Sequence, residues 1–556
     1  MIPALTNVPG IDPEYQAFFS ALKEAGFTGD IETSFSSRLA VATDNSVYQW
    51  LPQGAVFPKS SDDVVCLVKL VSDPKFRKVR FTPRGGGTGT NGQSLNSGIV
   101  VDLSRHMTAI LEHNAEEHWV RVQPGVIKDD LNSRIKSTGY FFSPDLSTSN
   151  RATIGGMIST DASGQGARRY GRTSRHVLSV SVVLMDGTLA EFSPKSGIAL
   201  REKLGLKTFE GDLYRIVYGI AKGRRAEIEK TFPDLNRFLT GYDLKHVYDP
   251  ETDTLDLSRI ICGSEGTLAF IVEAKLDLTK IPAFRALVNV KYDSFDSALR
   301  NAPLMMKADA LSVETVDSKV LNLAKSDIVW YQVKDLIKEV PGKDLQGINI
   351  VEFSGDDEEH QNELVESLCR RLDQQMERGE AGVIGYQTCK DLPSILSVYA
   401  MRKKSVGLLG KAPGDAKPIP FTEDTAVPPE HLADYILEFR ALLDSYHLKY
   451  GMFGHIDCGV LHVRPALDMT DPEQEKTLRR ISDRMVELTK KYGGLMWGEH
   501  GRGFRSEYGP KYFGDLYPEL RKIKKAFDPD NRLNPGKIAV PEGNDEKLVS
   551  VDFQKR

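Results

Sequence analysis

The segment from Pro144 to Gly171 constrains the fold more than any other part of this 556-residue chain. It reads PDLSTSNRATIGGMISTDASGQGARRYG and is rich in glycine and small polar residues. A loop of this length is uncommon inside a compact domain unless it has a function. Its backbone donors and small side chains suit a segment that wraps a flat ring system and a phosphate tail. We therefore expect this part of the chain to enclose a ligand of that kind.

A second glycine-dense segment, Phe81–Gly92, reads FTPRGGGTGTNG and follows a strand-like run at 78–82. Consecutive glycines let several backbone N–H groups converge on an anion, which suits a dinucleotide pyrophosphate. The spacing is neither GxGxxG opening a crossover helix nor GxxxxGK[ST], so neither a Rossmann fold nor a P-loop is predicted. Taken alone, such a loop is equally compatible with a flexible surface turn.

A third feature is the histidine-containing pair of segments GHIDCGVLH at 454–462 and WGEHG at 497–501. Imidazole and carboxylate are the ligands of zinc- or manganese-like cations, and three protein ligands leave one coordination position open. We predict that His455, His462 and Glu499 bind such a cation and that His500 is the neighbouring proton acceptor. The alternation VLHVRP predicts a strand, so a turn is needed to bring the first two histidines together. The alternative is a pair of ordinary histidines in a strand–turn–strand segment.

Composition narrows the class of protein. A net charge of -5 gives no electrostatic case for nucleic acid. No apolar run is long enough to span a membrane, and the first ten residues do not have the pattern of a secretory signal. The five cysteines are scattered without a CxxC motif, so neither a disulfide framework nor an iron–sulfur cluster is predicted. We expect reduced thiols in a chain of two or three domains that is cytoplasmic or bound at the inner face of the membrane.

Hydrophobic periodicity predicts the local elements. Short apolar runs at hairpin-like spacing occupy 99–103, 109–113 and 119–123. The segment 177–192 is predicted as a hairpin around Asp186-Gly187, and 260–278 as two strands around a glycine turn. From residue 286 onward, strands alternate with helices. This pattern indicates an α+β layer in which helices pack on one face of an antiparallel sheet.

The ordered motifs resemble a known flavoprotein family. PRGGGTGT at 83–90, the 144–171 segment and GSEGTLAFI at 263–271 resemble the FAD-binding domain of the vanillyl-alcohol-oxidase superfamily. GHx6H at 454–462, GEHG at 498–501 and LNPGK at 533–537 resemble the FAD-linked oxidase C-terminal domain. The resemblance covers residues 45 to 540 and is to the D-2-hydroxyacid dehydrogenase branch. The bacterial D-2-hydroxyglutarate dehydrogenases, whose flavin module precedes an iron–sulfur half, are the most similar members.

The resemblance implies a two-subdomain FAD-binding domain of the PCMH type, joined to an α+β substrate or cap domain with an antiparallel sheet. The chain would then divide into a helical lead-in (1–45), the FAD-binding domain (46–282), the cap domain (283–500), a segment returning to the flavin (501–540) and a tail or linker (541–556).

The resemblance also implies site residues. Arg402, Lys417 and His500 would bind substrate, with His500 catalytic. Lys403 and Lys404 are instead expected on a solvated helix face. Val460 replaces the family's asparagine, so no polar substrate contact is implied there. We expect the FAD to be non-covalent, because residues 84–92 contain no histidine or cysteine. The residues implied to contact it are Pro83, Arg84, Gly85, Gly86, Gly87, Thr88, Gly89, Thr90, Pro144, Asp145, Ser147, Thr148, Thr153, Gly155, Gly156, Ser159, Thr160, Ala162, Gly164, Tyr170, Gly171, Glu265, Gly266, Leu268, Ile271 and Asn534.

The implied activity is oxidation of D-2-hydroxyglutarate to 2-oxoglutarate by hydride transfer to flavin, with one divalent metal, for which we favour zinc. Electrons would pass to an acceptor other than NAD, either an iron–sulfur domain or a carrier outside this chain. A homo-oligomer is compatible with the sequence. Three alternatives remain: a dehydrogenase of D-lactate or another D-2-hydroxyacid, a zinc hydrolase without flavin, and a non-catalytic flavoprotein subunit.

Overall fold

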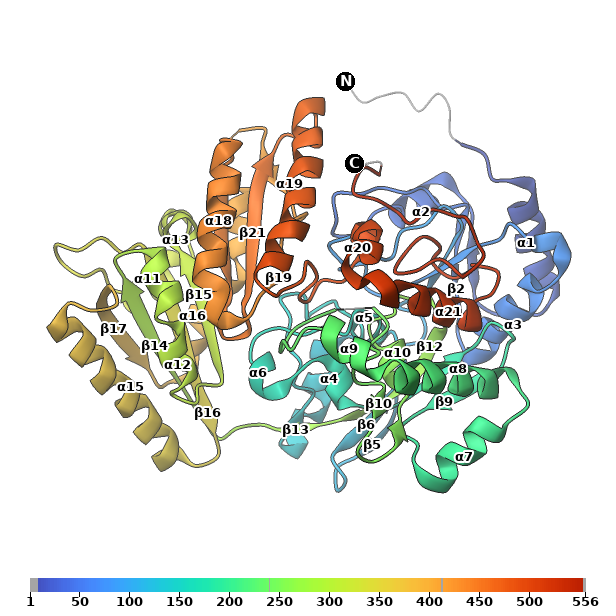
Figure 1. Ribbon diagram of the computed structural model, residues 1–556, viewed down its shortest axis with the longest axis horizontal. Helices are drawn as coiled ribbons and strands as arrows, with labels where there is room; N and C mark the ends of the chain where they lie inside the picture. Colours follow the sequence, from blue (N-terminus) through green and yellow to red (C-terminus); the bar gives the residue numbers. More distant parts are fainter. Residues whose placement is uncertain (1–8, 240, 412–413, 554–556) are drawn as a thin grey trace.

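A computed structural model of the chain describes residues 9–239, 241–411 and 414–553. Residues 1–8 of the predicted lead-in and 554–556 of the predicted tail lie outside the described residues. One part of the molecule contains the chain up to residue 282 together with the C-terminal segment, and the other is built around a large sheet that begins at residue 284 (Figure 1).

The first of three main sheets carries the glycine-dense loop. Its strand order is β1-β2-β4-β3, with bounds Asp30–Glu32, Gly54–Phe57, Ile99–Asp102 and Phe81–Arg84. Strand β4 runs parallel to both β2 and β3, whereas β1 is antiparallel to β2. The apolar run at 99–103 is therefore not part of a hairpin with the next run, as its spacing suggested. Its partners come earlier in the chain, which the spacing alone does not encode.

The second sheet is antiparallel. Its order is β5-β6-β12-β8-β9, with bounds Ile110–Asn114, Trp119–Val122, Phe270–Asp277, Val177–Val183 and Leu189–Phe192. The β8–β9 hairpin is confirmed. The segment 260–278 differs from the expectation, because its first part is the short helix α10 (Ser258–Ile261) and only its second part is the strand β12. The two sheets together confirm the predicted two-subdomain architecture of this part of the chain.

The third sheet has eight strands and forms the centre of the cap domain. Seven follow the order β17-β14-β16-β15-β20-β21-β18, and β19 also pairs with β21. Their bounds are Val383–Cys389, Phe284–Tyr292, Gly347–Gly355, Ser312–Asp317, Tyr450–His455, Val460–Leu467, Lys417–Pro418 and, for β19, Thr425–Ala426. All described pairings in this sheet are antiparallel, as predicted.

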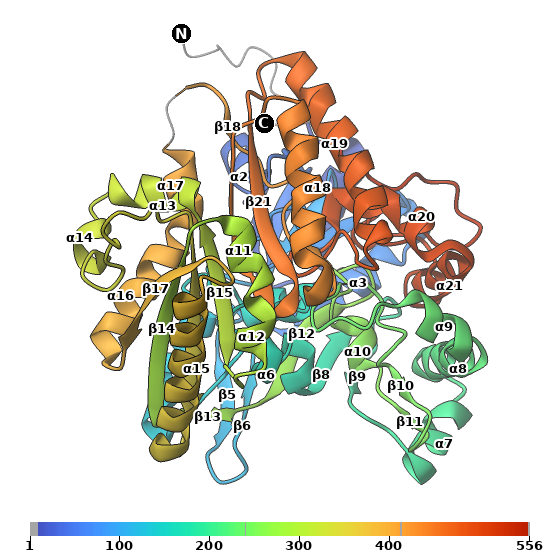
Figure 2. The same ribbon diagram turned by 60° about the vertical axis from the view of Figure 1, so that its left-hand side comes forward.

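Helices cover both faces of the third sheet, not one as expected (Figure 2). Alternate residues of β14 enter different cores: Val288 belongs to the hydrophobic cluster that also contains residues of α15, α11, α18 and α19, and Leu287 to the one that contains residues of α13, α14 and α16. The apolar residues on both faces of β14 are the sequence signal for this double cover. On the first face, the bounds are Glu358–Arg378 for α15, Phe295–Arg300 for α11, Leu432–Ser445 for α18 and Pro472–Lys491 for α19. On the second face, they are Ser318–Lys325 for α13, Trp330–Val333 for α14 and Leu392–Lys403 for α16, which is followed by α17 (Ser405–Gly410).

The C-terminal segment returns to the FAD-binding part of the molecule. After η6 (Gly503–Tyr508), α20 (Gly509–Phe513) and α21 (Tyr517–Phe527), Leu533 forms a β-bridge with Phe81 beside the glycine-dense loop. The remaining longer helices are α1 (Pro13–Glu24), α2 (Phe35–Ala40), α3 (Ser61–Val71), α4 (Lys128–Ile135), α5 (Ile154–Thr160), α7 (Gly197–Gly205), α8 (Phe209–Gly223) and α9 (Arg225–Thr231). Within the described ranges, none of the helices combines the length and apolar character needed to cross a membrane.

Candidate active site

A cavity of about 520 Å³ lies between the glycine-rich segments and the third sheet. This volume is within the range of about 300–1,000 Å³ typical of sites for small molecules and cofactors. Most of the predicted FAD-contacting residues line it, from Pro83 to Thr90, from Asp145 to Gly164, and at Glu265, Gly266 and Ile271. The cap domain closes it with Glu314, Arg402, Phe453, His455, His462, Arg464, Glu499 and His500.

Five predicted cofactor residues are not among those that line the cavity: Pro144, Tyr170, Gly171, Leu268 and Asn534. Asn534 instead supports the loops that do. Its side-chain amide donates to the carbonyls of Gln93 at 2.8 Å and Glu265 at 2.7 Å, and the Thr82 hydroxyl donates to its carbonyl oxygen at 3.2 Å. Because these contacts join three segments far apart in the sequence, Asn534 organises the cavity wall from behind.

A β-hairpin brings His455 and His462 together, as the sequence pattern required. His455 ends β20, His462 lies on β21, and the intervening turn closes at Gly459 with φ +68°. A Cβ at Gly459 would stand 1.8 Å from the carbonyl oxygen of Val427, so only glycine fits this turn. The hairpin thereby presents both imidazoles to one side of the cavity.

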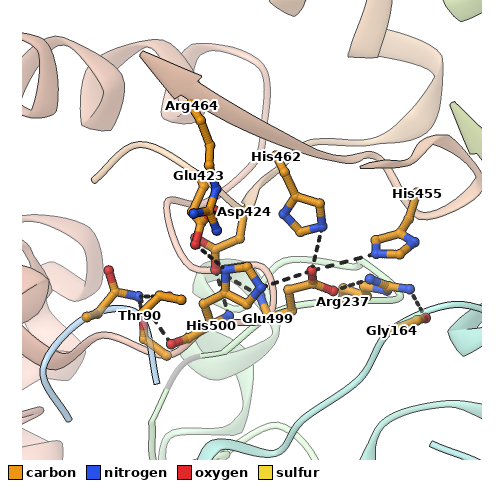
Figure 3. A network of polar contacts seen from close by, with 12 residues as sticks. Thr90, Gly164, Arg237, Glu423, Asp424, His455, His462, Arg464, Glu499 and His500 are labelled. Atoms are coloured by element: carbon orange, nitrogen blue, oxygen red, sulfur yellow. Dashed lines mark hydrogen bonds and ion pairs between the residues drawn. The ribbon is translucent and has the colours of Figure 1, made fainter. Parts of the chain in front are cut away.

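Glu499 completes the predicted cation-binding group. One of its oxygens, Oε1, lies 3.7 Å from Nε2 of His455, 3.0 Å from Nε2 of His462 and 3.3 Å from Nε2 of His500 (Figure 3). One ligand atom from each of His455, His462 and Glu499 lies within 4.8 Å of the others, and all three residues are buried. We call these three residues the triad. Glu423, His462 and His500 form a second, overlapping group that satisfies the same spacing.

The surroundings of the triad fit a divalent cation. Nδ1 of His455 pairs with the buried carboxylate of Glu314, which leaves Nε2 free to coordinate, and Arg237 donates to the other oxygen of Glu499. Such partners fix the tautomer and orientation of metal ligands. Burial lowers the pKa of His462 to about 4, which keeps this ring in the neutral, ligating form. Burial alone would raise the pKa of Glu499, but Arg237 and the two histidines hold it well below its usual range.

His500 is held from its backbone as well as its ring. Its N–H donates to Asp424 at 2.7 Å, its carbonyl accepts from Asn91 at 3.2 Å, and Nδ1 lies 3.0 Å from Glu423. Burial alone would lower the pKa of His500, but the carboxylates of Glu423 and Asp424 outweigh it and raise that pKa to about 10. A cation bound at the triad would oppose the effect of these two carboxylates on the pKa of His500. With Nδ1 directed to Glu423, Nε2 is the ring nitrogen that faces the triad and the cavity.

The two basic residues predicted to bind substrate, Arg402 and Lys417, lie in different places. Arg402 lines the cavity and pairs with Glu314 at 2.8 Å, whereas Lys417 lies in β18 opposite Leu467 and is exposed. Leu467 is five positions from His462 along β21, a distance of about 17 Å for a strand. The structure thus does not bring Lys417 to the cavity. Lys403 and Lys404 are exposed, as expected, although Lys403 also borders the cavity and pairs with Asp145 at 3.5 Å across the two parts of the molecule.

Sequence reasoning missed Glu314, Arg237, Glu423 and Arg464. Glu314 carried a signal, because it lies in the strand-like run SVETVD, and a carboxylate buried within a sheet must be paired to remain charged. Arg464 carried another, because residues two apart in a strand share a face and His462 is already directed to the cavity. Arg237 and Glu423 lie in irregular segments and carried none.

Fold and cavity together define a class: a two-subdomain nucleotide-binding part whose cavity is closed by an antiparallel cap domain. Residues 52–193 match the family described as FAD binding domain, and residues 281–538 match FAD linked oxidases, C-terminal domain. The chain thus contains an FAD binding domain followed by a C-terminal domain of the kind found in FAD linked oxidases.

Its relatives include D-2-hydroxyglutarate dehydrogenases of bacteria. The chain is 60% identical to that of Escherichia coli, with 100% of this chain and 55% of the relative covered. It is 58% identical to that of Pantoea ananatis, with 100% and 54% covered. The chain thus spans about half the length of the curated relatives it matches. A crystal structure of p-cresol methylhydroxylase with substrate bound has the same fold, with a TM-score of 0.67 and 15% identity over 97% of this chain and 99% of that one.

The glycine-dense loop gives a first prediction. A Cβ at Gly86 would lie 2.2 Å from the carbonyl oxygen of Arg151, so Gly86→Ala must displace backbone that lines the cavity. We expect FAD affinity to fall by about tenfold or more, since relieving such overpacking costs about 1–3 kcal/mol. The ratio of flavin to protein absorbance after dialysis measures it. The control is Gly219→Ala on α8, where nothing lies within 4 Å of the added Cβ. Equal flavin retention by both variants would show that the loop does not shape the FAD site.

Proposed function

We propose that this chain is the flavin module of a dehydrogenase that oxidises D-2-hydroxyglutarate to 2-oxoglutarate with FAD and one divalent cation. The observation that carries the proposal is the triad, which opens into the same cavity as the glycine-rich segments of the FAD-binding domain. Over this chain, 60% of the residues are identical to those of a D-2-hydroxyglutarate dehydrogenase, which supports the same substrate class. The FAD-binding match argues against the alternative of a zinc hydrolase without flavin.

When bound, FAD supplies the hydride acceptor, and the cation supplies Lewis acidity that lowers the pKa of the substrate hydroxyl. His500 accepts the hydroxyl proton at Nε2, because Nδ1 is directed to Glu423. Glu314 and Arg237 hold the triad, and Asp424 holds the backbone of both Glu499 and His500. The cap domain limits access of water, since His455, His462 and Glu499 are at most 7% exposed.

Arg402 supplies positive charge for the distal carboxylate of a dicarboxylic substrate. Its guanidinium lies 4.7 Å from the centre of the Phe453 ring and pairs with Glu314 on the His455 side of the triad. A guanidinium can bind both oxygens of a carboxylate, which makes this position suited to a diacid. Electrons then leave the flavin for an acceptor other than NAD, either an iron–sulfur segment or a separate carrier.

An anaerobic titration of the purified flavoprotein tests the proposed reaction. We expect D-2-hydroxyglutarate to bleach the flavin band near stoichiometric amounts and the L-enantiomer to leave it unchanged. A flavin that no D-2-hydroxyacid reduces would contradict the proposal and favour a non-catalytic, electron-transferring subunit.

A second prediction concerns substrate choice. Arg402→Gln should lower kcat/KM for D-2-hydroxyglutarate by about 10- to 100-fold, because a hydrogen bond to a charged group contributes about 1.5–3 kcal/mol. D-lactate lacks the distal carboxylate, so its kcat/KM should change less than about threefold in this variant. Arg440→Gln is the matched control, since Arg440 faces the buried Asp317 at 3.8 Å in the same domain but does not line the cavity. An equal loss for both substrates would remove Arg402 from the distal site.

A further inference from the structure

Arg464 is a second guanidinium in the cavity wall, and the proposed mechanism leaves it without a role. It lies on β21 two residues after His462, so both side chains project from the same face of the strand. Its side chain is 10% exposed and lines the cavity, whereas the Glu423 carboxylate that it contacts is completely buried. The guanidinium of Arg464 therefore faces the cavity, and the carboxylate of Glu423 lies behind it.

The contacts of Arg464 leave part of the guanidinium available. In the described part of the chain, Glu423 is its one ion-pair partner, through Nη2, and its buried Nε has no hydrogen-bond partner. A buried ion pair contributes little net stability, because desolvation of the two charges offsets their attraction. Stability alone thus gives no reason to place this pair in a cavity wall, whereas recognition of an anionic ligand does.

The two arginines of the cavity lie on opposite sides of the triad. Arg402 is connected to His455 through Glu314, whereas Arg464 is connected to His500 through Glu423. In Figure 3, Arg464 and His455 stand on opposite sides of His462. A ligand held at the triad therefore meets one guanidinium on each side.

We propose that Arg464 binds the substrate carboxylate adjacent to the hydroxyl, and that Arg402 binds the distal one. This inference rests on the proposed function. His500 takes the hydroxyl proton, so the hydroxyl lies on the His500 side of the triad. The adjacent carboxylate is bonded directly to the hydroxyl carbon, whereas two methylene groups separate the distal carboxylate from it, so the adjacent one is the carboxylate that we assign to that side. Arg464, joined to His500 by Glu423, is the cation positioned to bind it.

Ligand affinity tests this assignment without turnover. Oxalate and 2-oxoglutarate do not reduce flavin, and their binding to the oxidised holoenzyme is followed as a shift of the flavin spectrum. Oxalate mimics only the end of the substrate that carries hydroxyl and carboxylate. Arg464→Gln should raise Kd for both ligands by about 10- to 100-fold. Arg402→Gln should raise Kd for 2-oxoglutarate alone. Arg440→Gln, the matched control, should change neither.

Metal and FAD contents are measured for each variant, because an unpaired Glu423 could disturb folding. If Arg464→Gln loses either, Arg464→Lys decides, since lysine keeps the charge but cannot bind both carboxylate oxygens. We expect Kd for both ligands to rise several-fold in that variant. Unchanged Kd values with slower flavin reduction would overturn the proposal and leave Arg464 a positioning residue for His500. A rise for 2-oxoglutarate alone would also overturn it. Failure of the wild-type flavin to be reduced by D-2-hydroxyglutarate would instead refute the proposed function.

Discussion

Replacing Glu499 with Gln is expected to release the proposed cation and to slow anaerobic flavin reduction by about 10³-fold or more. The two imidazoles of the triad are neutral, so its negative charge comes from Glu499. The amide of Gln lacks this charge. Replacing even a partner of a metal ligand weakens metal binding by about 10- to 100-fold, and loss of a ligand should exceed this. Loss of the cation removes several kcal/mol of stabilisation of the developing alkoxide, which corresponds to about three orders of magnitude in rate.

Metal content per flavin, measured by elemental analysis, and the rate of flavin bleaching in a stopped-flow experiment check this prediction. Glu519→Gln is the matched control, because Glu519 is a buried, ion-paired glutamate on α21 that does not line the cavity. A Glu499→Gln variant that retains the wild-type metal content would show that the cation, if present, is held elsewhere. The overlapping group of Glu423, His462 and His500 would then be the next candidate.

Replacing His500 with Asn is expected to slow flavin reduction by about 10³-fold while metal and FAD contents stay unchanged. Positioned general bases contribute about 10²- to 10⁴-fold. In the proposed mechanism His500 accepts the proton, whereas His455, His462 and Glu499 hold the cation, so the two functions should separate in these variants. The stopped-flow rate constant at saturating substrate, together with elemental analysis of the same preparation, checks this.

His176→Asn serves as the control for the His500 variant. His176 is buried, donates from Nε2 to the Tyr170 carbonyl at 2.7 Å, and does not line the cavity. A His500→Asn variant that loses its metal would place His500 among the ligands. A variant that reduces its flavin at the wild-type rate would remove His500 from the chemistry.

Patterns local in sequence were sufficient to predict the principal parts of this site. The histidine hairpin needed a turn between two strand-like runs, and Gly459 supplies it. The glycine-dense loop and the segment after residue 144 were identified by composition, and both line the cavity. In each case the residues that must meet are close in the chain, so their spacing carries the geometry.

Residues that reach the site from distant segments could not be identified in this way. Glu314 lies 141 residues from His455, and Arg237 lies 262 residues from Glu499. Such pairs depend on the order of strands in the third sheet and on how the two parts of the molecule pack. Lys417 is the converse case, because residue type and the family resemblance predict substrate binding, whereas the pairing of β18 places this residue at the far end of β21. The parallel pairing of β4 escaped prediction for the same reason.

The most direct test is the anaerobic flavin spectrum, recorded with D-2-hydroxyglutarate before chelation, after chelation and after readdition of Zn²⁺ or Mn²⁺. We predict rapid bleaching of the flavin band in the native protein. The bleaching should be lost once chelation lowers the metal content to about a tenth of the flavin content. Readdition of the cation should restore it. Bleaching that continues unchanged in metal-free protein would contradict the claim that a cation at His455, His462 and Glu499 presents the substrate to the flavin.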